Sequence, residues 1–191
     1  MAYDRYDDRP RGRHSHGGHG GYGGHGGGHG GGHERRGIPL SDLDPALTDL
    51  SRRAIGCAIE VHKALGPGYD RDVYYAAFKL ELAAEGVAFK ENHRFDVSYR
   101  SQKVGDAGAD LYLGDRFLLN VLARSGEVTH GDRVGLRAAL KAADLELGLV
   151  INFAERRLKD GLVRVLNIDK IRAEREEDEG DDEYEDEEGE D

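Results

Sequence analysis

The residues able to build a hydrophobic core are concentrated between positions 38 and 173, and this restricts what the 191-residue chain can fold into. Residues 1–37 hold 14 of the 28 glycines and six of the nine histidines, whereas residues 174–191 hold 14 acidic residues and one arginine. Glycine loses much backbone entropy on folding, and a run of like charges repels itself. We therefore expect a disordered arm (1–37), one folded domain (38–173) and a disordered acidic tail (174–191).

The formal net charge of −11 is unevenly distributed along the chain. The arm carries +2 and the tail −13, while residues 38–173 contain 20 basic and 20 acidic residues and are neutral. Affinity for a polyanion such as DNA comes largely from cations that displace its counterions. The charge distribution therefore argues against nucleic acid as a partner.

Several other partners and compartments are also disfavoured. No stretch approaches the roughly 20 apolar residues that cross a bilayer, and the N-terminus lacks the apolar centre of a signal peptide. The single cysteine, Cys57, has no second cysteine for an intrachain disulfide or a cysteine-based zinc motif. These features predict a cytoplasmic protein with neither a membrane nor a disulfide partner.

Six histidines punctuate the arm, namely His14, His16, His19, His25, His29 and His33. Neutral imidazoles bind zinc, nickel or copper, so the arm is a candidate for loose metal binding. A specific site needs ligands in fixed geometry, which glycine spacers do not provide. A solvated arm without a metal is therefore the competing interpretation.

The periodicity of the domain predicts a mixed α/β (α+β) fold. An apolar stripe from Leu47 to Leu65 indicates a first helix, which Asp44-Pro45 begins and Gly66-Pro67-Gly68 ends. A second helix is expected over 70–85 and a third over 132–143. Strands are expected at 95–99, 103–106, 110–113, 116–123, 147–153 and 162–166. The run 117–122 is almost continuously apolar and predicts a central, buried strand.

The residues from Ala58 to Gly68, followed by Tyr74, resemble the start of the GxxExxY family of the PD-(D/E)XK nuclease superfamily. The resemblance continues in order through 103–106, Ala109-Asp110, 116–123 and 147–153, and covers about residues 47–166. It implies a nuclease-like mixed sheet flanked by helices.

Members of that superfamily hold Mg²⁺ beside the scissile phosphate with an Asp on one strand and a Glu on the next. A Lys two residues after that Glu, an acidic residue from the helical region and a helical Gln assist. By this resemblance the chain retains Glu60, His62 and Asp110. It replaces the helical Glu by Arg71, the metal-binding Glu by Asn120, the Lys by Leu122 and the Gln by Gly135.

These replacements remove charge and ligands together, so we expect neither a catalytic site nor a cofactor. The resulting hypothesis is an inactive nuclease fold that acts in self-assembly or partner binding, as a homo-oligomer or with another protein. One alternative is a Mg²⁺-dependent DNA nuclease that uses Glu60 and Asp110. The other is a metal-binding protein that acts through the histidine arm.

Overall fold

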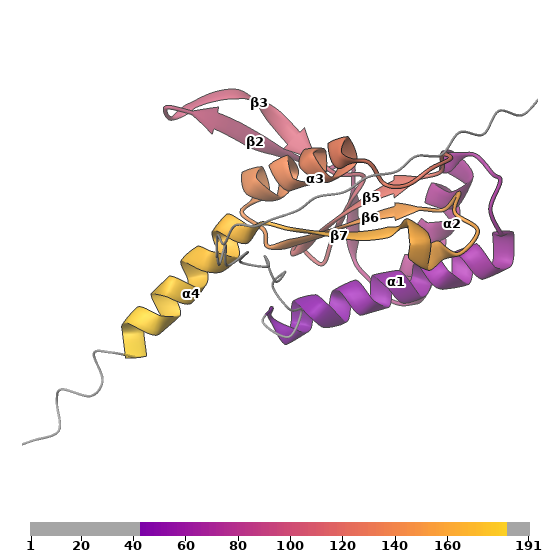
Figure 1. Cartoon of the computed structure of the whole chain (residues 1–191), viewed down its shortest axis with the longest axis horizontal. Coiled ribbons are helices and arrows are strands. Elements are labelled where there is room, and N and C mark those ends of the chain that lie inside the picture. The colour runs from indigo at the N-terminus through magenta and orange to yellow at the C-terminus, as the bar shows by residue number, and fades with distance from the viewer. Residues whose placement is uncertain (1–42, 183–191) are drawn as a thin grey trace, which may run out of the picture. The chain divides into compact units, whose positions relative to one another are not determined.

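The computed structural model describes residues 43–182. The histidine arm and the end of the acidic tail lie outside these residues. Within them the elements follow in the order α1, α2, β1 to β5, α3, β6, the short 3-10 helix η2 (Leu158–Gly161), β7 and α4 (Figure 1). This mixed α/β arrangement confirms the fold class expected from the sequence.

Helix α1 spans Pro45–Leu65 and has the ends that its sequence predicts. Asp44 Oδ1 accepts a hydrogen bond from the Ala46 amide at 2.7 Å, and Pro45 occupies the first turn. Gly66 ends the helix with a φ of 67°, a conformation that side chains other than glycine rarely adopt. Leu47, Ala54 and Ala58 lie on the buried face of α1.

Helix α2 (Arg71–Ala84) is apolar on two sides. It buries Tyr74, Phe78 and Leu82, which recur every four residues and therefore share one face. Val73 and Leu80 are apolar residues of the same helix but are exposed, at 42% and 75%. The sequence thus predicted the helix but not which face is buried.

The main sheet has the strand order β1-β4-β5-β6-β7. Its strands are β1 (Phe89–Glu91), β4 (Leu111–Leu113), β5 (Phe117–Leu122), β6 (Leu147–Asn152) and β7 (Leu162–Leu166). All neighbouring pairs are antiparallel except β5 and β6, which run parallel because α3 (His130–Ala143) connects them. β5 is central and largely buried, as its sequence predicts.

β2 (Arg94–Tyr99) and β3 (Gln102–Gly108) form a separate two-stranded ribbon and do not join the main sheet. In Figure 1 the ribbon lies above α3. Arg100 and Ser101 turn the chain between the two strands with φ values of 48° and 63°. The ribbon therefore adds a wall next to the main sheet without extending it.

Helices lie on both faces of the main sheet (Figure 1), and a hydrophobic cluster fills each interface. On one face α1 and α2 pack on alternate residues of the strands, such as Leu119 and Val121. On the other face α3 packs through Leu136 and Leu140 on Leu118. Two covered faces explain why β6 is buried along its whole length.

Helix α4 (Ile168–Asp182) was not expected from the sequence. Ile171 is its buried residue, and Lys170 forms ion pairs with Asp144 and Glu174. The helix continues to Asp182, although the acidic tail was expected to be unstructured from residue 174. Within 43–182, no helix has the length and apolarity to cross a membrane.

Candidate functional site

A pocket of about 430 Å³ opens beside the C-terminal half of β5. Its walls come from the start of α2, the start of β2, the β3–β4 connection and β5. The lining residues are Arg71, Asn92, Arg94, Gly108, Ala109, Asp110, Asn120, Val121 and Leu122. The fold therefore gathers four positions that the resemblance had singled out.

Asp110 lies between β3 and β4, and both of its carboxylate oxygens have partners. Oδ1 is 2.6 Å from Arg71 Nη2, and Oδ2 accepts a hydrogen bond of 2.8 Å from the Val121 amide. The side chain is only 23% exposed, so these contacts are partly shielded from water. Asp110 is thus held against β5 by an arginine and a backbone amide.

Arg71 occupies the first turn of α2 and reaches across to β5. Besides the ion pair with Asp110, its Nε donates to the Val121 carbonyl at 2.9 Å. Its guanidinium also lies over the Tyr75 ring, 5.1 Å from the centroid. Three directed contacts fix this cation next to the carboxylate of Asp110, where the superfamily resemblance places a metal ion.

Tyr75 supports this arrangement from the next turn of α2. Its hydroxyl donates to the Asp110 carbonyl at 3.0 Å and contacts Glu91 Oε2 at 3.3 Å. Burial, followed by the charge of Glu91 and the hydrogen bond to it, raises the pKa of Tyr75 to about 12. Tyr75 is therefore a neutral donor at ordinary pH.

Asn120 and Leu122 point to the same side of β5, since side chains alternate along a strand. Asn120 Oδ1 accepts a hydrogen bond of 3.1 Å from the Asp110 amide. Leu122 packs against the hydrophobic cluster under α3. Asn120 thus joins β5 to Asp110, and Leu122 extends the core where the resemblance expects a lysine.

The residues around Asp110 do not fit a hard divalent cation, which needs several oxygen ligands close together. Both oxygens of Asp110 and the Oδ1 of Asn120 already accept hydrogen bonds or an ion pair. Arg71 adds a positive charge beside them. Among the described residues, no three His, Cys, Asp or Glu side chains form a group that could hold a metal ion.

Three other positions named by the resemblance are not among the residues that line this pocket. Glu60 pairs with Lys63 at 2.7 Å along α1 and borders a different cavity together with Cys57. His62 is hydrogen-bonded to the Glu155 carbonyl at 2.9 Å. Gly135 lies on α3, where an added Cβ would meet no atom within 4 Å. Glu60 and Asp110, the two acids of the nuclease alternative, therefore line different pockets.

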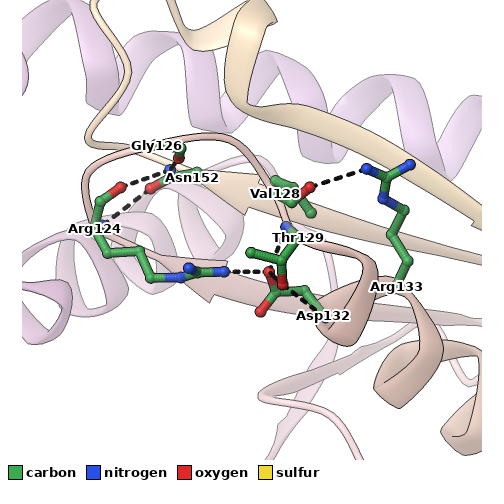
Figure 2. A network of polar contacts seen from close by, with 7 residues as sticks. All are labelled: Arg124, Gly126, Val128, Thr129, Asp132, Arg133 and Asn152. Carbon is green, nitrogen blue, oxygen red and sulfur yellow. Dashed lines mark hydrogen bonds and ion pairs between the residues drawn. The ribbon is translucent and has the colours of Figure 1, made fainter.

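A second polar network fixes the loop that leaves β5 (Figure 2). The buried Asn152 on β6 donates through Nδ2 to the carbonyls of Arg124 and Gly126, at 2.8 and 2.9 Å. Its Oδ1 accepts from the Arg124 amide at 3.1 Å. Thr129 and Asp132 then cap the start of α3 reciprocally, and Arg124 pairs with Asp132. The network sets the position of the strand end that carries Leu122.

Asn92, Arg94 and Tyr75 contribute to the site but were missed from the sequence. Tyr75 lies four residues after Arg71, so helical spacing was the signal that could have found it. Asn92 and Arg94 line the pocket because the chain turns sharply at Asn92, whose φ is 48°. Arg94 pairs with Asp106 across the ribbon at 3.0 Å.

The five-stranded mixed sheet, its flanking helices and a pocket at the end of the central strand define a nuclease-type α/β domain. A family model described as PD-(D/E)XK nuclease superfamily matches residues 48–165, from α1 to β7. The chain belongs to this superfamily, as its sequence predicted. No match to a curated protein or to a solved structure was found.

Proposed function

We propose that this PD-(D/E)XK domain no longer hydrolyses phosphodiesters and acts instead by associating with further copies of itself. The observation that carries the proposal is the ion pair between Arg71 and Asp110. A guanidinium fixed on this carboxylate competes with any metal for the same oxygen. The neutral Asn120 and the apolar Leu122 remove the charges that would hold a cation and a phosphate.

The outer face of α2 supports the second half of the proposal. Val73, Ala76, Leu80 and Ala83 are all exposed and repeat at steps of three and four residues. Together with the buried inner face they make α2 apolar on two sides, a property of helices that are covered all round. A groove of about 390 Å³ between α2 and Phe89 of β1 adjoins this stripe. An exposed apolar stripe of this kind is typical of an association surface.

Two measurements on the full chain test the two halves of the proposal. Light scattering after size-exclusion chromatography is expected to give a mass above that of one chain. Incubation with plasmid DNA and Mg²⁺ or Mn²⁺ is expected to give no cleavage. A monomer at every concentration would contradict the association, and cleavage that is lost in Asp110→Ala would contradict the inactivity.

A gain-of-function variant tests the role assigned to Arg71 directly. The triple variant Arg71→Glu, Asn120→Glu and Leu122→Lys restores the residue types of the superfamily at these positions. It is expected to bind Mn²⁺ in calorimetry, because three carboxylates then converge without the competing guanidinium. Asn120→Glu and Leu122→Lys with Arg71 retained form the control, and equal Mn²⁺ affinity in both variants would contradict the role of Arg71.

A further inference from the structure

The outer side of α3 carries positive charge in a regular row. Arg133, Arg137 and Lys141 are exposed and lie four residues apart, so they follow one another along the same face. Like charges at this spacing repel one another, so an anion bound along the row would relieve the repulsion.

The row continues onto the start of α4. Lys141 forms an ion pair with Asp169 at 2.5 Å. The pKa of Asp169 is lowered by the hydrogen bond and charge of Lys141 and also by the charges of Arg172 and Arg137. Four cations, Arg133, Arg137, Lys141 and Arg172, therefore form one surface, which we name the basic stripe.

The two arginines of α3 in the basic stripe are held in place by backbone carbonyls. Arg133 Nη2 donates to the Val128 carbonyl at 3.1 Å (Figure 2), and Arg137 Nε donates to the Leu166 carbonyl at 3.4 Å. A carbonyl orients a guanidinium without neutralising its charge. The stripe therefore presents net positive charge on a rigid scaffold.

The chain itself contains a segment of matching chemistry. The acidic tail, residues 174–191, holds 14 acidic residues and one arginine. We infer that the acidic tail of one copy binds the basic stripe of a second copy. The inference rests on the proposed association of copies and assigns one of its contacts.

The charge of α4 favours a second copy over the same chain. From Asp169 to Asp182 the helix rises by about 20 Å, and the nine residues that follow span at most about 30 Å. To return to its own stripe, the tail would run back along α4, whose second half is itself acidic in sequence. Like-charge repulsion opposes that path, whereas the stripe of another copy is reached without it.

A cross-linking experiment on the full chain tests this assignment. Isotopically light and heavy copies are mixed and treated with a zero-length carbodiimide, which joins carboxylates to lysine amines. The expected products link Lys141 of one isotope to tail carboxylates of the other. These links should disappear in about 1 M NaCl, where the screening length falls to roughly 3 Å, while the internal Lys141–Asp169 link reports on reagent activity.

Two charge variants localise the contact. Arg133→Glu with Arg137→Glu retains Lys141 for detection and is expected to abolish the mixed-isotope links, and the milder Arg133→Gln with Arg137→Gln is expected to reduce them. Arg52→Glu with Lys63→Glu on α1 is the matched control, since both side chains are highly exposed and lie outside the stripe. The control should retain the links.

If every link joined residues of the same isotope, the tail would be binding the stripe of its own chain, and the inference would be overturned. Mixed-isotope links that persist unchanged in the stripe variants would overturn it as well. So would a DNA duplex that binds the full chain and is released by the stripe substitutions. Light scattering of the same samples distinguishes a failure of the tail contact from a failure of the proposed association of copies. An oligomer without mixed links refutes only the tail contact, whereas a monomer throughout refutes the proposed association as well.

Discussion

At the scale of single residues, Arg71 has the largest influence on the site because its guanidinium balances the charge of the Asp110 carboxylate. Arg71→Ala leaves a carboxylate that is 23% exposed with only its backbone hydrogen bond. We expect the free energy of unfolding to fall by about 1–2 kcal/mol in urea titrations. Arg52→Ala, at a highly exposed residue of α1, should change it by less than about 0.5 kcal/mol.

A double-mutant cycle separates this ion pair from general effects on α2. In the background Asp110→Asn the carboxylate charge that pairs with Arg71 is gone. The further loss in free energy of unfolding caused by Arg71→Ala should therefore be smaller than in the parent chain. Equal costs in both backgrounds would show that Arg71 acts through its bond to the Val121 carbonyl or its contact with Tyr75.

Tyr75 makes the folding stability of the chain depend on pH in the alkaline range. Its pKa is about 12 in the folded chain, against 10 when exposed, because of burial and the neighbouring Glu91. From about pH 10 upward the unfolded chain loses this proton while the folded chain keeps it, so stability declines as the pH rises. Tyr75→Phe removes this contribution.

The comparison of Tyr75→Phe with the parent chain should therefore change with pH. We expect the variant to lose less stability than the parent between about pH 10 and pH 12 in urea titrations, whatever the difference at neutral pH. A constant difference over that interval would contradict the raised pKa of Tyr75.

At the scale of elements, the sequence predicted those features that depend on neighbouring residues and missed those that depend on contacts between distant parts of the chain. The ends of α1 follow from local groups, Asp44 with Pro45 at the start and Gly66 at the end, and both were predicted. β1 has three residues and exists because it pairs with β4, so no local pattern marks it. The periodicity of α2 indicated a helix, but two apolar faces left the buried one undecided.

The same distinction between local and distant information applies to the candidate site. The resemblance to the superfamily indicated which residue types stand at the positions where its members carry ligands, because that information is in the sequence. It did not indicate that Arg71 contacts Asp110, since this contact requires α2 to pack against β5. Helix α4 was missed for another reason. Its acidic residues repel one another, yet Glu, Arg, Lys and Ala all have high helix propensity, and Lys170 pairs with Glu174.

The loop after β5 provides a prediction at this scale. Asn152→Ala would remove the hydrogen-bond partners of two backbone carbonyls and two backbone amides, and Asn152 is buried, so we expect a loss of about 2–4 kcal/mol in the free energy of unfolding. Gln102→Ala, which removes an exposed amide side chain on β3, is the control and should cost far less. Similar losses in both variants would contradict the structural role of Asn152.

At the scale of the whole molecule, the folded domain is electrically neutral while the acidic tail carries most of the net charge. Association through α2 would then be mainly apolar, and association through the tail mainly ionic. The two contacts differ in their response to salt, because screening weakens charge pairs and leaves apolar burial largely intact. As the salt concentration rises, the acidic tail should dissociate from the basic stripe while the contact through α2 remains. The measured oligomer mass should therefore fall only in part.

Leu80 is the residue through which the apolar contact can be tested. It is 75% exposed at the middle of the outer face of α2, so Leu80→Glu should leave the fold intact and introduce an uncompensated charge into the association surface. We expect light scattering to show a shift to lower mass at equal concentration, in high salt as well as low. Val104→Glu, on the ribbon and also exposed, is the control and should keep the parent mass. If Leu80→Glu leaves the mass unchanged in high salt, α2 is not the apolar contact.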